Sequence, residues 1–172
     1  MLKLHNPSVR AFSATGVFAI AGILGFLYAP STHFVWPDAL FYAIILINTF
    51  FSIRFFTRIT PPSRAQNLID AALVVSYLAL AFSLGHEWAF IFFALVVFIM
   101  APIKYVLMLG VVPMDSLLKK KLLIDLAGTV MCAAALIGAV LLDYPLTSAW
   151  ALAILFTLAN IYLLAIRPMY RL

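Results

Sequence analysis

Charged residues are scarce in this sequence. Of its 172 residues, 10% are Asp, Glu, Lys or Arg, whereas 66% are hydrophobic. A soluble domain has about a quarter charged and about half apolar residues, and a water-soluble fold of this length cannot bury so much apolar surface. The composition therefore excludes an ordinary soluble domain and predicts an all-α, polytopic integral membrane protein.

Cysteines and catalytic motifs are almost absent as well. A single cysteine, Cys132, excludes an intramolecular disulfide and a cysteine-rich metal site. The sequence has no H-E-x-x-H zinc motif, no GxGD-type aspartyl motif and no Ser/His/Asp set at a common depth. No histidine pair lies within the apolar runs to ligate haem, and no basic patch interleaved with aromatics suggests nucleic acid. We therefore expect a non-enzymatic protein without a cofactor, a metal or a nucleic-acid partner.

Six apolar runs have the length of a membrane-spanning helix, which is about 17–25 residues. Backbone in the hydrocarbon core must satisfy its own hydrogen bonds, so each run should be a helix. Short connections predict antiparallel packing of consecutive helices in one domain, residues 1–172. The runs cover residues 11–28, 39–56, 68–84, 88–109, 122–142 and 149–166.

Capping residues mark where some of these helices begin. Asn6 followed by Pro7 has the pattern of an N-cap and a first helical residue. Ser63, with Gln66 three residues later, has the pattern of a capping box. Pro102 lies near the end of the fourth run and should bend that helix.

The connections differ in charge. Those after the first, third and fifth runs contain no Lys or Arg and carry one acid each, Asp38, Glu87 and Asp143; one tryptophan lies in each connection or at the start of the next run, at Trp36, Trp88 and Trp150. The basic residues lie in the other connections and near the termini: Lys3, Arg10, Arg58, Arg64, Lys119, Lys120, Lys121 and Arg171. The positive-inside rule then predicts a multi-pass protein of the cell (plasma or inner) membrane with both termini cytoplasmic, and tryptophan marks the outer interface.

The same pattern predicts an internal repeat of three helical hairpins, at about residues 8–60, 63–113 and 116–172. The tripeptide Leu-Ile-Asp occurs in the second and third units, ending at Asp70 and Asp125. One cation lies near the end of each returning helix: Arg54, Lys104 or Arg167. The first unit has no acid at the corresponding depth, so a symmetric three-fold pore is not expected.

The segment "AIAGILGFLYAP" (Ala19–Pro30) is a glycine-containing outward helix closed by proline. Together with the three tandem hairpins it resembles the HdeD-like small membrane proteins, although units two and three do not share the glycine and proline pattern. The resemblance implies a six-helix fold and a role in acid-stress tolerance in a bacterial inner membrane. It implies no catalytic residues.

Asp70 and Asp125 are the residues with the greatest potential for chemistry. An ionised carboxylate inside a membrane segment needs a partner, a water path or a proton. We expect Arg54 to pair with Asp70 and Lys104 to pair with Asp125, because each cation ends the helix before the acid. Such groups either neutralise each other or extend towards the headgroups, or they couple the movement of a proton or cation.

Further polar residues suggest two other sites. Asn48 and Asn160 lie within the second and sixth runs, where they would bond across helices or line a substrate path. His33, Asp38, His86 and Glu87 share the outer side, where a His/acid cluster could bind a divalent metal or respond to acid pH. Their spacing does not match a metal motif, so loop histidines near the headgroups explain them equally well.

Small residues concentrate in the first and fifth runs, and phenylalanines in the second and fourth. Small residues permit close helix packing, so we expect the first and fifth helices to be central. The second and fourth should then face lipid or a partner, unless their aromatic side chains fill the bundle.

Together these features predict an accessory, assembly or stress-related membrane protein that contacts lipid, other membrane helices or further copies of itself. The alternative is a small transporter or channel coupled to protons or cations. A cavity where polar residues of the second, third, fifth and sixth helices converge would favour transport, and paired, dry groups would favour the scaffold.

Overall fold

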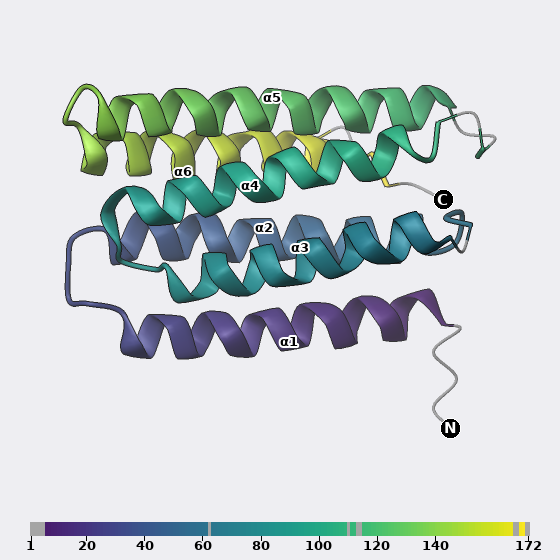
Figure 1. Ribbon diagram of the computed structural model, residues 1–172, viewed down its shortest axis with the longest axis horizontal. Helices are drawn as coiled ribbons and strands as arrows, with labels where there is room; N and C mark the ends of the chain where they lie inside the picture. Colours follow the sequence, from purple (N-terminus) through teal and green to yellow (C-terminus); the bar gives the residue numbers. More distant parts are fainter. Residues whose placement is uncertain (1–5, 62, 110, 113–114, 167–168, 171–172) are drawn as a thin grey trace.

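The computed structural model describes residues 6–61, 63–109, 111–112, 115–166 and 169–170, and the described residues contain no strand. It has six α-helices, all running nearly parallel to the long axis (Figure 1). All six are long and apolar enough to cross a membrane, which confirms the predicted fold class at this level. The helices are α1 (Pro7–Tyr28), α2 (Val35–Phe56), α3 (Arg64–Phe82), α4 (Glu87–Val106), α5 (Asp115–Val140) and α6 (Pro145–Ile161), with a π-helical turn η1 (Tyr162–Ile166) continuing α6.

Four helices, α1, α2, α3 and α6, begin about one turn before the predicted apolar run, and the first turns of α1 and α3 are capped by a side chain. Asn6 Oδ1 accepts the backbone N–H of Ser8 at 3.0 Å, as predicted for an N-cap before Pro7. Ser63 Oγ accepts the N–H of Gln66 at 3.1 Å. The reciprocal half of the expected capping box is not formed among the described residues, since Gln66 Oε1 has no donor there and Gln66 Nε2 donates to the carbonyl of Lys104 on α4 at 3.3 Å.

The six helices pack in a closed order, α1–α2–α6–α5–α4–α3 and back to α1. Consecutive helices pair as the hairpins α1/α2, α3/α4 and α5/α6. The helix pairs through which the hairpins contact one another differ in relative direction. α1 meets α3 and α2 meets α6 in parallel, but α4 meets α5 antiparallel (Figure 1). The hairpins therefore do not follow one another around a threefold axis, and the sequence repeat stays a prediction.

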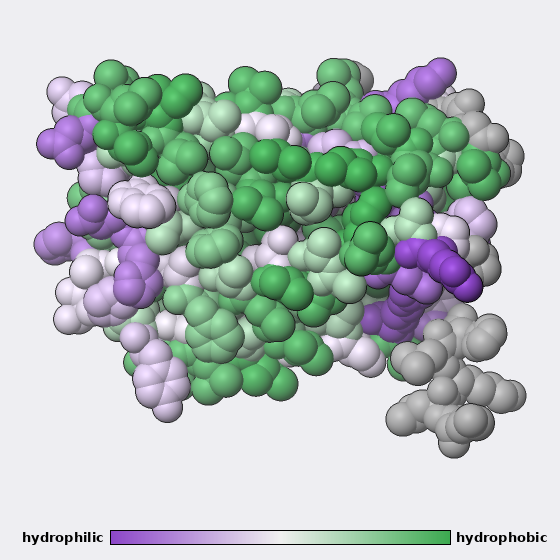
Figure 2. Space-filling model, viewed as in Figure 1, coloured by the Kyte–Doolittle hydropathy of each residue, from purple (hydrophilic) through white to green (hydrophobic). Residues whose placement is uncertain are grey.

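The two ends of the bundle differ in composition. We call one the tryptophan end, where the three hairpin turns lie and Trp36, Trp88 and Trp150 are exposed. The other is the basic end, where α1 begins, η1 ends and the side chains of Arg58 and Lys120 are exposed. Between them the face shown in Figure 2 is an apolar belt. Lys3, Arg167 and Arg171 lie outside the described residues.

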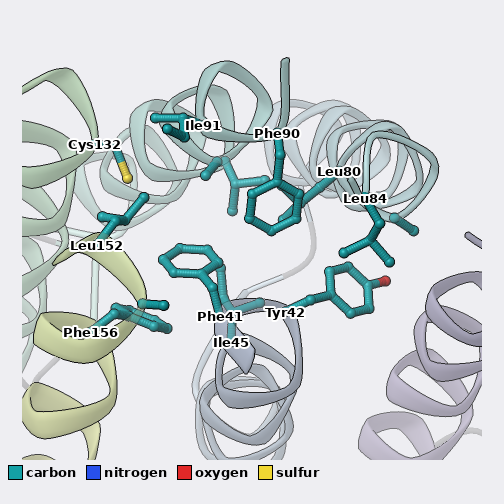
Figure 3. Close-up of a cluster of buried hydrophobic side chains, with 14 of the residues drawn as sticks. Phe41, Tyr42, Ile45, Leu80, Leu84, Phe90, Ile91, Cys132, Leu152 and Phe156 are labelled. Atoms are coloured by element: carbon teal, nitrogen blue, oxygen red, sulfur yellow. The ribbon is translucent and has the colours of Figure 1, made fainter. Parts of the chain in front are cut away.

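Aromatic side chains from α2, α4 and α6 fill the centre of the bundle. We call Phe41, Phe90, Phe98 and Phe156 the aromatic layer; Phe41 contacts each of the other three, with ring centroids 4.6–6.4 Å apart. Figure 3 shows Phe41, Phe90 and Phe156 converging on one another from separate helices. The layer belongs to the main apolar core of the bundle.

The expectation that α1 and α5 are central and that the phenylalanines of α2 and α4 face outwards was wrong. Phe41 and Phe90 are each 1% exposed. α4 has the most buried span and α5 the least. The small residues of α1 instead allow close packing against one neighbouring helix. A Cβ on Gly25 would overlap the backbone carbonyl of Ala81 on α3. Close contact with one neighbour does not require a central position.

Candidate binding cavity

A cavity of about 400 Å³ lies inside the basic half of the bundle. This volume is typical of a small-molecule site, for which the range is about 300–1,000 Å³. Five helices, α1 to α5, supply its walls. Its polar lining comprises Arg10, Asn48, Thr49, Ser52, Thr57, Thr60, Gln66, Asn67, Asp70, Tyr77, Lys104, Tyr105, Lys121 and Asp125.

The cavity has an open side and a closed side. Arg10 and Asn67, on the first turns of α1 and α3, are exposed and line it at the basic end. Phe18, Ile45 and Phe98 line it deeper in the bundle and belong to the apolar core. The cavity therefore opens at the basic end, has a further exposed lining residue at Val74 on α3, and stops at the aromatic layer.

Asp70 lies at the meeting point of α1, α3 and α4. Lys104 Nζ is 2.5 Å from Asp70 Oδ1, and Arg10 Nη2 is 3.7 Å from Asp70 Oδ2. The predicted Arg54–Asp70 pair was wrong, since Arg54 is exposed and forms no ion pair within the described part of the chain. The physical reason is the helix order, because Asp70 faces α1 and α4, while α2 lies across the cavity.

Asp125 pairs within its own helix. Lys121 Nζ is 2.6 Å from Asp125 Oδ1, and the side chains are 5% and 3% exposed. Residues four apart lie on the same face of a helix, so this pair replaces the predicted Lys104–Asp125 pair, which was wrong. Asp125 Oδ2 is buried and accepts no hydrogen bond from a described residue. Lys121 Nζ also lies 5.7 Å from the ring centre of Tyr105.

The interruption of α4 at Pro102 is stabilised from α5. Proline has no N–H, so the carbonyl of Phe98, four residues earlier, loses its helical donor. Thr129 Oγ1 on α5 lies 2.7 Å from that carbonyl oxygen and donates to it. Side chains of neighbouring helices often satisfy such carbonyls in membrane helices. The helix continues to Val106.

Hydroxyl pairs across the cavity were not anticipated from the sequence. Thr49 Oγ1 and Tyr77 Oη are 2.5 Å apart, and Ser52 Oγ and Tyr105 Oη are 2.9 Å apart. These pairs join α2 to α3 and α2 to α4. The only sequence signal was the presence of tyrosine and hydroxyl residues inside apolar runs, which does not indicate which of them meet.

The two asparagines have different partners. Asn48 Oδ1 accepts a hydrogen bond from Tyr170 Oη at 3.2 Å. Burial raises the pKa of the Tyr170 hydroxyl. Asn160 Nδ2 donates to the carbonyl of Phe156 in its own helix at 2.9 Å, and Asn160 Oδ1 is buried without a described donor. Asn160 lines a second pocket, of about 240 Å³, between α5 and α6.

The predicted outer-face group is not one site. His33, His86 and Glu87 are exposed, whereas Asp38 is 1% exposed and its Oδ2 accepts the N–H of Gly85 at 3.0 Å. Gly85 has a φ of 79°, a conformation that glycine adopts without strain. Asp38 thus fastens the α3–α4 turn to α2. In the part of the chain that the structure describes, no three His, Cys, Asp or Glu side chains are arranged to hold a metal ion.

No protein-family model, curated protein or solved structure matches this chain.

Proposed function

We propose that this chain is a small multi-pass membrane transport protein that binds its solute in the central cavity. The observation that supports this most strongly is the cavity itself, where charged and hydroxyl side chains from five helices converge inside an apolar bundle. Ionisable groups at such positions are costly and are commonly found along substrate or ion paths.

The exposure of the ionic groups favours transport over a purely structural role. A scaffold predicts pairs that are dry, as Lys121 and Asp125 are. The side chains of Asp70 and Lys104 are 29% and 19% exposed and line the cavity. These two groups and Arg10 line the part of the cavity nearest the basic end.

Transport also needs the cavity to open at the tryptophan end. The aromatic layer blocks that route, so α2, α4 and α6 must separate there in a second conformation. Alternating access by rocking of helix groups around a fixed site is the usual mechanism in small transporters. The three hairpins contact one another through different helix pairs, α1/α3, α2/α6 and α4/α5, and each contact is a surface along which such movement can occur.

The orientation is part of the proposal. The basic connections and the start of α1 share one end of the bundle, and the positive-inside rule places that end in the cytoplasm. The cavity then opens to the cytoplasm in the present conformation. The membrane is the plasma membrane or, in a bacterium, the inner membrane.

The accessory or stress-related role, including the one implied by the HdeD-like resemblance, is a second candidate. The dry Lys121–Asp125 pair supports it, because a buried neutralised pair is compatible with a purely structural function. This role predicts a stoichiometric partner that co-purifies in mild detergent, with no catalytic activity or cofactor. Transport predicts that the chain functions without such a partner.

Side-specific labelling of a cavity cysteine tests the proposal. Ser52→Cys is nearly isosteric, and the native Cys132 is fully buried, so the unmodified chain sets the background. Oriented vesicles are treated with a membrane-impermeant maleimide from one side or the other. Ser31→Cys and Lys120→Cys, exposed at opposite ends, verify the sidedness. Transport predicts labelling of Ser52→Cys from both sides, and labelling from the basic side alone would refute it.

A further inference from the structure

The second pocket lies on the flank of the bundle, between α5 and the α6–η1 segment. Its walls are mainly apolar and include Ile124, Met131 and Leu163. Ala127 and Ala159 line it and are exposed, so it opens on the outer surface of the bundle. Both lie within the candidate membrane spans Ser116–Val140 and Pro145–Ile166. The opening therefore faces the hydrocarbon of a surrounding bilayer.

Helix packing explains why the pocket is on this side. At the tryptophan end α5 and α6 are in close contact, since a Cβ on Gly138 would lie 2.6 Å from Ser148 Oγ. Nearer the basic end the helices leave the pocket between them, and α6 changes there to the π-helical turn η1. Tyr162 and Leu163 of that turn line the pocket. Single π-helical turns are frequent at functional sites.

The inner end of the pocket has unused hydrogen-bond acceptors. The residues Asp125 and Asn160 are 2% and 4% exposed, and Asp125 Oδ2 and Asn160 Oδ1 have no donor within the described residues. Buried acceptors of this kind are normally hydrogen-bonded. This pocket and the central cavity share a wall, which is formed by Asn48, Phe98 and Asp125.

The charges indicate which head group fits. Asp125 is the one charged residue among the described residues that line the second pocket, and Lys121 neutralises it, so the pocket carries no net charge that would attract a cation. An anionic group would lie against Asp125. Both unused atoms are acceptors, so they require a donor without charge, and a hydroxyl meets that requirement.

We infer that the solute of this protein is an amphiphile with one alkyl chain and an uncharged, hydroxyl-bearing head, and that it enters from the bilayer between α5 and α6. The alkyl chain occupies the apolar flank pocket. The hydroxyls donate to Asp125 Oδ2 and Asn160 Oδ1 at the boundary of the central cavity. This inference rests on the proposed transport function and defines the class of its solute.

Photolabelling in lipid nanodiscs tests the inference. The full chain is irradiated with a monoacylglycerol that carries a diazirine in its alkyl chain, and the labelled residues are mapped by mass spectrometry. We expect labels on residues of α5 and η1 that line the flank pocket, Met131 and Leu163 among them. An excess of unlabelled monoacylglycerol should reduce labelling severalfold, whereas the methyl ester of the same fatty acid, which lacks a donor, should not.

A matched pair of variants links the label to the pocket. Ala159→Phe fills the pocket from an exposed position, and Ala151→Phe places the same side chain on an exposed position of α6 outside both pockets. We expect a severalfold loss of labelling in Ala159→Phe and none in Ala151→Phe. Equal labelling of the two variants, or equal competition by the methyl ester, overturns the inference.

The two proposals fail in different ways. If labelling is specific but Ser52→Cys reacts from one side alone, the inference holds and the transport function fails. The protein then binds an amphiphile without transporting it. Reactivity from both sides without specific labelling leaves a transporter of another solute.

Discussion

Replacing Lys121 with methionine removes one partner of the buried ion pair while nearly preserving the side-chain volume. Asp125 Oδ1 then loses its donor at 2.6 Å, and Asp125 Oδ2 has no described donor in the intact protein. The variant must therefore either hold an unpaired carboxylate in the bundle or take up a proton.

The magnitude follows from the geometry. At 2.6 Å and an effective dielectric constant of about 20, two unit charges attract by about 6 kcal/mol. Desolvation of the two ions offsets much of this attraction, but removal of one partner leaves the other's desolvation uncompensated and costs about 3–5 kcal/mol. For a chain of this size, that corresponds to a fall in Tm of roughly 6–20 °C.

The assay is thermal unfolding in detergent, followed by circular dichroism and tryptophan fluorescence. Lys120→Met, the neighbouring but exposed lysine, is the matched control and should change Tm little. The double variant Lys121→Met/Asp125→Leu should recover most of the loss, since replacing a whole buried pair by apolar residues is often neutral.

If Lys121→Met is no more destabilising than Lys120→Met, the pair does not lie in a low-dielectric site and its loss costs no desolvation. If the double variant is as unstable as the single one, the loss comes from packing and not from the unpaired carboxylate.

Three further substitutions test the helix contacts. Thr129→Val should destabilise the fold by about 0.6–1.7 kcal/mol in equilibrium unfolding by SDS, because the carbonyl of Phe98, which Pro102 cannot satisfy, loses its donor. The control is Thr157→Val, which removes only a bond within α6 and should have a smaller effect. Gly25→Ala should cost about 1–3 kcal/mol by overpacking α1 against α3, whereas Gly16→Ala, with open space around the new methyl group, should be neutral or stabilising in the same assay. Asp38→Ala should cost about 1–3 kcal/mol by leaving the buried N–H of Gly85 without an acceptor, and Asp38→Asn should restore most of that loss in thermal unfolding.

The helices could be predicted from the sequence because their signals are local. An apolar run of spanning length must be helical whatever surrounds it, and a cap such as Asn6 or Ser63 depends on the next three residues alone. Six successive spanning helices place their connections at alternate ends of the bundle. The distribution of basic residues and tryptophans between the two ends follows from this alternation.

The ion pairs could not be predicted, because they depend on which helices become neighbours. We expected Asp70 to pair with Arg54 on the helix that precedes it in the chain. The fold places α3 between α1 and α4, so Arg10 and Lys104 reach Asp70 instead. The spacing of four residues between Lys121 and Asp125 is a local signal for an ion pair within one helix.

The role of the phenylalanines was ambiguous for a different reason. Lipid and the protein interior are both apolar, so a run such as Phe90 to Phe93 does not reveal which of its side chains point inwards. In the structure Phe90 is buried and Phe92 is 42% exposed. Only the packing of α4 against its neighbours decides between them.

The rate at which Ser52→Cys reacts from the tryptophan side shows whether the aromatic layer opens. An impermeant maleimide is applied to oriented vesicles at the tryptophan end alone. Alternating access predicts measurable labelling there, slower than that of Ser31→Cys and above the background of the unmodified chain. A rate equal to that background contradicts it, because the aromatic layer would then never open.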